Sequence, residues 1–289
     1  MEQTKGCYNM KNFALLFLVF AVIVTVMPFV ADATIEKSDV LTVSVCFSDG
    51  RIEDIELEDY VLRVLAARED EVTELEAKKA FAVAARSIGM YFATFGCKHA
   101  GFDCCDSGDC CIELSPSNSA SEGTQNAVRE TNGQYLETDK APALALFSLC
   151  ASSGTVQSDE FGYLVPVASG ESCEKHKTEK RLTDAELLSL FPEVKEEMKF
   201  YAVYGENNKL SFAIFNGRQI NGDLLASAFG LKSTEITFEE VEGGIKAVSY
   251  GVGHGIGLDL CNAEKLARDG MYYKKILEIY FPRLNLKVI

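Results

Sequence analysis

The stretch that decides the fold is SYGVGHGIGLD, residues 249–259, which is followed by a run of helical periodicity that ends at IYFP, residues 279–282. Its glycines alternate with apolar residues and with His254, one of three histidines in the chain. Glycines at this density let the backbone turn sharply and approach another group closely. We therefore expect a glycine-lined turn that carries an imidazole at the start of a packed helical unit. A core histidine in a tight turn is the plainer alternative.

Length and composition restrict the class of protein. The chain has 289 residues, enough for one large domain or two small ones, and 47% of them are hydrophobic, which supports a substantial core. The formal net charge is -15. Contacts to nucleic-acid phosphates require a basic surface, so this charge excludes nucleic acid as a partner.

The N-terminal segment predicts export. Residues 13–30 form an almost uninterrupted apolar run, about as long as a bilayer is thick. Lys5 and Lys11 precede it and the next basic residue is Lys37, so residues 1–12 are expected in the cytoplasm and the body outside it. The ADA sequence at 31–33 resembles a signal-peptidase site. Residues 13–33 are thus a single-pass membrane anchor, or a cleaved signal that leaves the body secreted.

Periodicity in residues 36–289 predicts one domain of the α+β class, with mixed helices and antiparallel hairpins. A hairpin of residues 40–47 and 51–57 turns at Asp49 and Gly50. Helices follow from residue 57 and from 74 to about 95, separated by the charged residues 68–71. Further on, the patterns predict helices at 116–131 (capped by Ser119 or Ser117), 183–191 and 221–230, strands at 143–150 and within 201–214, and a hairpin at 235–248.

A cysteine-rich loop lies at residues 97–111, CKHAGFDCCDSGDCC. It holds five of the ten cysteines and one histidine. Thiolate and imidazole ligands at this density suggest a structural zinc loop. A disulfide knot is the alternative, because an exported body would fold in an oxidising compartment.

Three separated stretches together resemble the stage II sporulation protein D family (SpoIID/LytB). The first is LEDYVLRVLAA at 57–67 with EAKKAFAVAAR at 76–86. The second is FSLCASSGT at 147–155, similar to the family's aromatic-His-Ser-x-Ser-Gly-Gly loop. The third runs from 224 to 282 and includes FGLKST and the glycine-histidine turn. The three cover nearly the whole exported body, in the family's order.

The resemblance implies a membrane-anchored lytic transglycosylase of forespore engulfment, acting on peptidoglycan strands stripped of stem peptides. One glutamate would protonate the glycosidic oxygen and then assist the attack of the sugar's C6 hydroxyl, giving a 1,6-anhydro end. In this chain Arg68 stands at the position of that glutamate, and a guanidinium cannot act as this acid. Glu69 is the neighbouring carboxylate and is assigned the catalytic role. Cys150 stands at the histidine position of the second motif.

The same resemblance implies further site residues. Arg86, Ser152, Ser153, Gly154 and His254 are expected to bind the glycan. Because Arg86 follows the small residues of the helix predicted from 74 to about 95, it is also a candidate buried ion-pair partner, with a solvated arginine as the alternative. Clostridial members of the family carry a pattern similar to His-x5-Cys-x4-His-Cys. This chain has His99, Cys105, Cys110 and Cys111 at the same spacing, with cysteine in place of the second histidine, so the resemblance implies these four as zinc ligands.

Two hypotheses follow. In the first the protein is a transglycosylase that uses Glu69. In the second it is a catalytically inactive relative that holds glycan, or a sporulation cell-wall partner, in the same cleft; the arginine at position 68 motivates this one. A zinc hydrolase is disfavoured, since four protein ligands leave the zinc ion no open coordination position for water or substrate.

Overall fold

The computed structural model describes residues 40–289 except 109, 170–173, 191–199 and 216. The chain divides into two units, Met1–Val40 and Leu41–Ile289, and the second contains every helix and strand discussed below. Its mixture of helices and mainly antiparallel sheets confirms the α+β class. The predicted anchor or signal, 13–33, lies outside the described residues. In the part that is described, no helix has the length and apolarity to cross a membrane.

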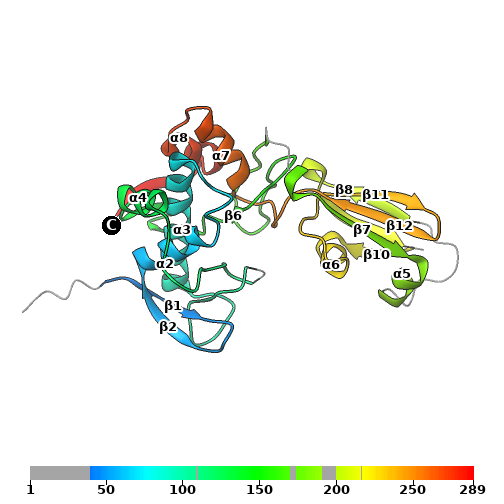
Figure 1. Cartoon of the computed structure of the whole chain (residues 1–289), viewed down its shortest axis with the longest axis horizontal. Helices are drawn as coiled ribbons and strands as arrows, with labels where there is room; N and C mark the ends of the chain where they lie inside the picture. Colours follow the sequence, from blue (N-terminus) through cyan, green and yellow to red (C-terminus); the bar gives the residue numbers. More distant parts are fainter. Residues whose placement is uncertain (1–39, 109, 170–173, 191–199, 216) are drawn as a thin grey trace, which may run out of the picture. The chain divides into compact units, whose positions relative to one another are not determined.

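The helix α3 (Leu75–Phe95) organises the first of two hydrophobic cores (Figure 1). Its small residues, among them Ala77, Ala80 and Ala84, are fully buried and allow other helices to approach closely. At Gly89 a Cβ atom would lie 2.7 Å from the Tyr60 ring, so this crossing requires glycine. The helices packed around α3 are α2 (Leu57–Ala66), α4 (Glu122–Glu130), α7 (Leu260–Arg268) and α8 (Tyr273–Tyr280).

Small sheets complete this core. The predicted N-terminal hairpin is confirmed: β1 (Thr42–Cys46) pairs antiparallel with β2 (Ile52–Glu56). The cysteine loop joins it through β3 (Cys104–Cys105), which runs parallel to β1 and so fixes the loop against the hairpin. A further sheet has the order β14-β4-β5 and consists of Asn285–Val288, Gln134–Thr138 and Ala141–Pro142.

The second core lies between two three-stranded sheets and two short helices. The predicted hairpin at 235–248 is confirmed, and β7 extends it, giving the order β11-β12-β7. The other sheet has the order β10-β9-β8. The bounds are β7 Thr178–Thr183, α5 Asp184–Leu190, β8 Phe200–Tyr204, β9 Leu210–Phe215, β10 Arg218–Asn221, α6 Gly222–Ala228, β11 Ile236–Val241 and β12 Gly244–Ser249.

Two local predictions are wrong. The strand expected over 143–150 is reduced to β6 (Phe147–Ser148), which pairs parallel with β13 (Leu258–Asp259). Upstream, the amides of Ala145 and Leu146 bond to carbonyls only two residues back, which is a turn geometry that sheet pairing does not allow. The apolar run is buried because it packs into the first core, without being a strand.

The second error concerns the cap of α4. Its N-cap is Ser121, and neither Ser119 nor Ser117 has this role. A capping box needs a glutamate that accepts from the backbone amide of the cap. Here Glu69, from the turn after α2, accepts that bond from Ser121 at 2.8 Å. The partner is therefore supplied from a distant part of the chain, which local sequence spacing could not indicate.

Candidate functional site

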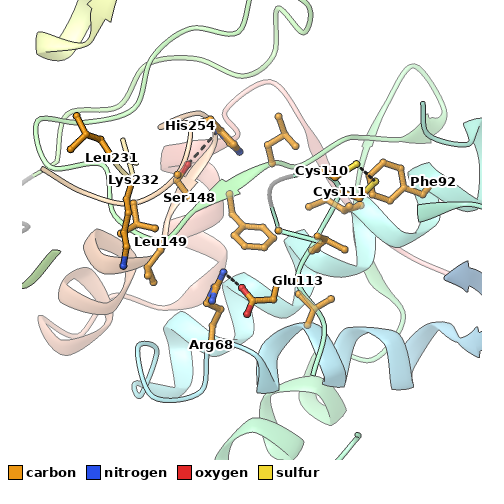
Figure 2. Close-up of a pocket in the computed structure, with 18 residues that line it drawn as sticks. Arg68, Phe92, Cys110, Cys111, Glu113, Ser148, Leu149, Leu231, Lys232 and His254 are labelled. Atoms are coloured by element: carbon orange, nitrogen blue, oxygen red, sulfur yellow. Dashed lines mark hydrogen bonds and ion pairs between the residues drawn. The ribbon is translucent and has the colours of Figure 1, made fainter. Parts of the chain in front are cut away.

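A pocket of about 640 Å³ brings together the end of α2 with the turn after it, α3, the loop after β3, the segment around β6, residues 231–232 and the glycine-rich turn (Figure 2). Aromatic rings of Phe92 and Phe147 form part of its apolar lining. Its hydroxyl and ionisable lining groups, apart from two cysteine thiols, are Arg68, Glu113, Ser148, Lys232 and His254. Glu113 is the one carboxylate that lines the pocket among the residues described.

One side of the pocket is formed by Ser148 and His254, which we call the imidazole wall. The Ser148 hydroxyl lies 3.3 Å from Nδ1 of His254 and accepts the amide hydrogen of Gly255 at 2.8 Å. The glycines make this possible. At Gly257 φ is +77°, and a Cβ atom there would lie 2.0 Å from the carbonyl oxygen of Leu146. The expected glycine-lined turn carrying an imidazole is therefore present, held against β6.

The hydrogen bonds of His254 define which ring nitrogen carries the proton. The amide of Ile256 donates to Nδ1 at 3.0 Å, so Nδ1 is an acceptor and the neutral ring is protonated at Nε2. Desolvation, followed by the charge of Lys209, lowers the pKa of His254 to about 4. At neutral pH the imidazole is a neutral donor through Nε2.

The other side is formed by Arg68 and Glu113, which we call the ion-pair wall (Figure 2). The guanidinium forms an ion pair with the carboxylate of Glu113. Arg68 lies in the turn after α2, where its amide bonds to the Leu65 carbonyl at 3.0 Å and its carbonyl accepts from Val72 at 3.1 Å. The backbone at the position where the resemblance predicts a glutamate is therefore fixed, and the side chain that lines the pocket there is a cation.

Glu69, the predicted catalytic residue, does not line the pocket. Its carboxylate accepts hydrogen bonds from the amide of Ser121 at 2.8 Å and the hydroxyl of Thr124 at 2.7 Å, and Lys78 lies 3.8 Å away. Desolvation opposes ionisation, but these hydrogen bonds and Lys78 outweigh it and hold the pKa of Glu69 below its ordinary value. Glu69 therefore joins α2 to the start of α4 in its charged form, and its catalytic role stays a prediction.

Arg86 is not in the pocket either. Its side chain is completely buried and makes two bonds of 2.7 Å to the Glu58 carboxylate, with a third of 2.9 Å to the Gln134 carbonyl. The pairing is the buried ion pair that a basic residue inside an alanine-rich helix requires. The expected role in glycan binding is therefore replaced by a structural one.

The Ser152–Ser153–Gly154 loop lies outside the pocket lining as well. The Ser153 hydroxyl donates to Glu235 at 2.6 Å, and its amide donates to the same carboxylate at 3.1 Å. Gly154 has φ of +124°, and a Cβ there would lie 2.5 Å from the Val167 carbonyl oxygen. Through Glu235 this loop is bonded to the segment that leads into β11 of the second core. Of the predicted glycan-binding residues, only His254 lines the pocket.

The four predicted metal ligands do come together. The ligand atoms of His99, Cys105, Cys110 and Cys111 all lie within 4.8 Å of one another. The sulfur atoms of Cys110 and Cys111 are 3.9 Å apart, close to the edge of about 3.8 Å in a tetrahedron with zinc–sulfur bonds of about 2.3 Å. The five cysteines of this loop are free thiols, which does not fit the disulfide knot. Three thiols and an imidazole suit zinc.

A second group of metal-type side chains had no signal in the sequence. Cys150, His176 and Cys261 have ligand atoms within 4.8 Å of one another, and both cysteines are buried. Cys150, however, is disulfide-bonded. A sulfur in a disulfide is not the thiolate that a metal requires, so this group is different in kind from the first.

Sequence reasoning missed Glu113, Ser148 and Lys232. Ser148 lies inside FSLCASSGT and Lys232 inside FGLKST, but no pattern in the sequence distinguishes either residue from its neighbours. Glu113 had one usable signal, since it follows the last expected zinc ligand by two residues and would be held close to the metal loop. Its proximity to Arg68 depends on the fold of that loop.

Comparison with known proteins adds three findings. The family model described as SpoIID, stage II sporulation protein, matches residues 48–137, the range that contains the ion-pair wall and the cysteine loop. Stage II sporulation protein D of Bacillus subtilis (strain 168) is 24% identical over 253 residues, covering 80% of this chain and 74% of that protein. The protein of the same name from Bacillus amyloliquefaciens is 22% identical over 282 residues, covering 89% and 81%.

Proposed function

Because this chain belongs to the SpoIID family, we propose that it takes part in sporulation by binding the glycan strands of peptidoglycan in the pocket between the two walls. The observation that carries the proposal is the lining of the pocket. Aromatic rings offer apolar faces to the C–H surface of a sugar, while Arg68, Lys232 and His254 supply donors to its oxygen atoms. The neutral Nε2–H of His254 suits an acetamido or ether oxygen.

The absence of an acid at position 68 is the reason to put binding first. Cleavage needs a carboxyl group that transfers a proton to the glycosidic oxygen. At the family's position the side chain is Arg68, and the adjacent Glu69 is bonded to Ser121 and Thr124 away from the pocket. Neither side chain can serve as that acid in this arrangement.

Binding is tested with purified glycan strands freed of stem peptides. Lys232→Glu reverses a charge in the pocket, and we expect it to weaken binding about tenfold. Lys180→Glu is the matched control, because it makes the same charge change on an exposed residue of β7 that does not line the pocket. Equal binding by both variants would contradict the proposed site.

Cleavage is the second candidate function, and Glu113 is the observation that favours it. This carboxylate lines the pocket on the side opposite His254 (Figure 2). In the reaction its carboxyl would give a proton to the glycosidic oxygen, and the resulting carboxylate would take the proton of the C6 hydroxyl as that oxygen attacks the anomeric carbon. The product is a 1,6-anhydro end, formed without water.

Mass spectrometry of digested glycan separates the possibilities. Glu113→Gln and Glu69→Gln are matched variants, since both neutralise one carboxylate and only the first is in the pocket. Anhydro products that are lost in Glu113→Gln and kept in Glu69→Gln would support cleavage by Glu113. Loss in Glu69→Gln alone would return the acid role to Glu69. No product with any variant leaves glycan binding as the function.

We also infer that His99, Cys105, Cys110 and Cys111 hold a structural zinc ion. Bound by four protein ligands, zinc supplies a fixed tetrahedral crosslink and no open coordination position. It would fix the loop that carries Gly108 and Glu113 at the edge of the pocket.

Residues 13–33 are proposed to anchor the protein in the cell membrane with the body extracytoplasmic, where it would meet peptidoglycan and sporulation partners of the cell wall. If the segment is instead cleaved, the body is secreted. Fractionation of sporulating cells, with the N-terminal mass of the mature chain, distinguishes these outcomes.

A further inference from the structure

The buried pair Arg86–Glu58 and the pocket pair Arg68–Glu113 differ in how they are built. Arg86 is inaccessible to solvent and donates two hydrogen bonds of 2.7 Å to Glu58. A ligand therefore cannot replace Glu58 as the partner of this guanidinium. Arg68 and Glu113 form the other pair, in which the side chains are 24% and 48% exposed. Pairs open to solvent contribute little and are readily replaced. The pair in the pocket is therefore the exchangeable one.

The guanidinium of Arg68 has unused bonding capacity. Arginine carries five N–H donors in a planar fork that matches a carboxylate with two parallel bonds. In the part of the chain that the structure describes, its ion-pair partner is one oxygen of Glu113. Lys232 adds a second cation to the lining, so the charged groups Arg68, Lys232 and Glu113 leave an excess of one positive charge. In a chain of net charge -15 such a pocket favours an anionic ligand group.

We infer that Arg68 is a specificity-determining residue that binds a carboxylate on the ligand, and that Glu113 occupies the guanidinium until this carboxylate replaces it. The inference rests on the proposed function and deepens it. Among the sugars of a glycan strand, the acidic one is the muramic acid residue, whose lactyl carboxylate is free only where no peptide is attached. The Arg68–Glu113 exchange would thus report a free acid at that position.

The geometry assigns separate tasks to the two walls. His254 presents one neutral donor from a backbone-fixed turn, which suits an uncharged sugar oxygen. Arg68 extends from a backbone held by its bonds with Leu65 and Val72, so it can exchange partners without moving the main chain. When a ligand carboxylate takes the fork, the Glu113 carboxylate is released into the pocket. No covalent bond is formed or broken in this step.

The experiment compares stem-peptide-free glycan oligomers in two forms, with free lactyl carboxylates or with these groups converted to methyl esters. Binding to the purified exported body is measured by titration calorimetry. We expect the wild-type protein to prefer the acid form about tenfold, as a charge-assisted pair provides. Arg68→Met should lose this preference, with the two forms bound within about twofold of each other.

Two further variants sharpen the result. Glu113→Gln removes the internal competitor and should tighten binding of the acid form by about threefold, while leaving the ester unchanged. Lys232→Met removes the other cation that lines the pocket and should keep the preference for the acid. If Lys232→Met abolishes the preference as fully as Arg68→Met, general charge and not Arg68 selects the ligand, and the inference is wrong.

The failures are distinguishable. Equal binding of acid and ester by the wild-type protein overturns the role of Arg68 and leaves glycan binding intact. If neither form binds, the proposed function itself fails, and the inference fails with it. Unchanged circular-dichroism melting curves for the variants establish that each result concerns recognition and not folding.

Discussion

The two walls of the pocket are built on different principles. In the imidazole wall the backbone fixes the side chains: Nδ1 of His254 accepts from the amide of Ile256, and glycines allow this turn to lie against β6, which carries Ser148. The ion-pair wall joins Arg68 to Glu113, which come from separate segments and meet only in the folded chain. A wall fixed by local backbone tolerates little change, whereas a wall made of paired side chains can alter its chemistry by substitution. The pairing with Glu113 shows how an arginine is accommodated at the position where the resemblance predicts an acid.

The largest effect is expected from breaking the support of the ion-pair wall. Removing zinc with a strong chelator should lower the melting temperature by about 10 °C or more, because metal binding contributes directly to folding free energy. Differential scanning calorimetry under reducing conditions measures the shift. Cys110→Ser should reproduce most of it, and Cys46→Ser, a free thiol outside the ligand set, should not. An unchanged melting curve after chelation would count against a structural metal.

The imidazole wall can be broken at one glycine. Gly257→Ala should destabilise the protein by about 3 kcal/mol or more, because φ of +77° is strained for alanine and its Cβ would clash with the Leu146 carbonyl oxygen. Gly270→Ala is the matched control, with φ of +89° and no atom within 4 Å of the added Cβ, and should cost about 1 kcal/mol. Urea unfolding gives both values. Equal costs would show that the close approach to β6 is unimportant.

A smaller effect separates the two carboxylates near α2. Glu69→Ala should reduce stability by about 1 to 2 kcal/mol through loss of the bonds to Ser121 and Thr124, without weakening glycan binding. Asp70→Ala removes an exposed neighbouring acid and should change stability by less than about 0.5 kcal/mol. A loss of glycan binding in Glu69→Ala at normal stability would mean that Glu69 belongs to the site after all.

A pH-dependent effect sharpens the account of the imidazole wall. The unfolded histidine takes up its proton near pH 6.5, whereas the pKa of His254 in the folded protein is lowered to about 4. Between these values the unfolded state binds more protons, so this residue makes stability rise with pH. His254→Asn should flatten that slope, as followed by urea unfolding between pH 4 and pH 6.5.

A second buried group acts in the opposite direction over nearly the same range. Burial raises the pKa of Asp259 to about 6, so its contribution falls as pH rises. Because Asp259 is present in both proteins, the difference between wild type and His254→Asn isolates the histidine. An identical pH slope in the two proteins would show that the imidazole is not desolvated.

The sequence predicted the parts of the fold that depend on local pattern. Helical periodicity identified α2 and α3, and turn residues identified the hairpins of β1–β2 and β11–β12. The resemblance to the family's His-x5-Cys-x4-His-Cys pattern identified the four metal-type ligands that lie together in the structure. The sequence could not indicate contacts between distant segments, such as Glu69 with Ser121 or Arg68 with Glu113. The catalytic expectation for Glu69 depended on such contacts, because the position of a residue along a helix does not specify which side chains from other segments lie beside it.

The ion pair in the pocket makes positions 68 and 113 interdependent. Replacing Arg68 by glutamate would bring two acids face to face, and their mutual repulsion would favour protonation of one of them. A stable charged acid at position 68 would then require a second substitution at 113. The charge at either position therefore limits which side chain the other can carry.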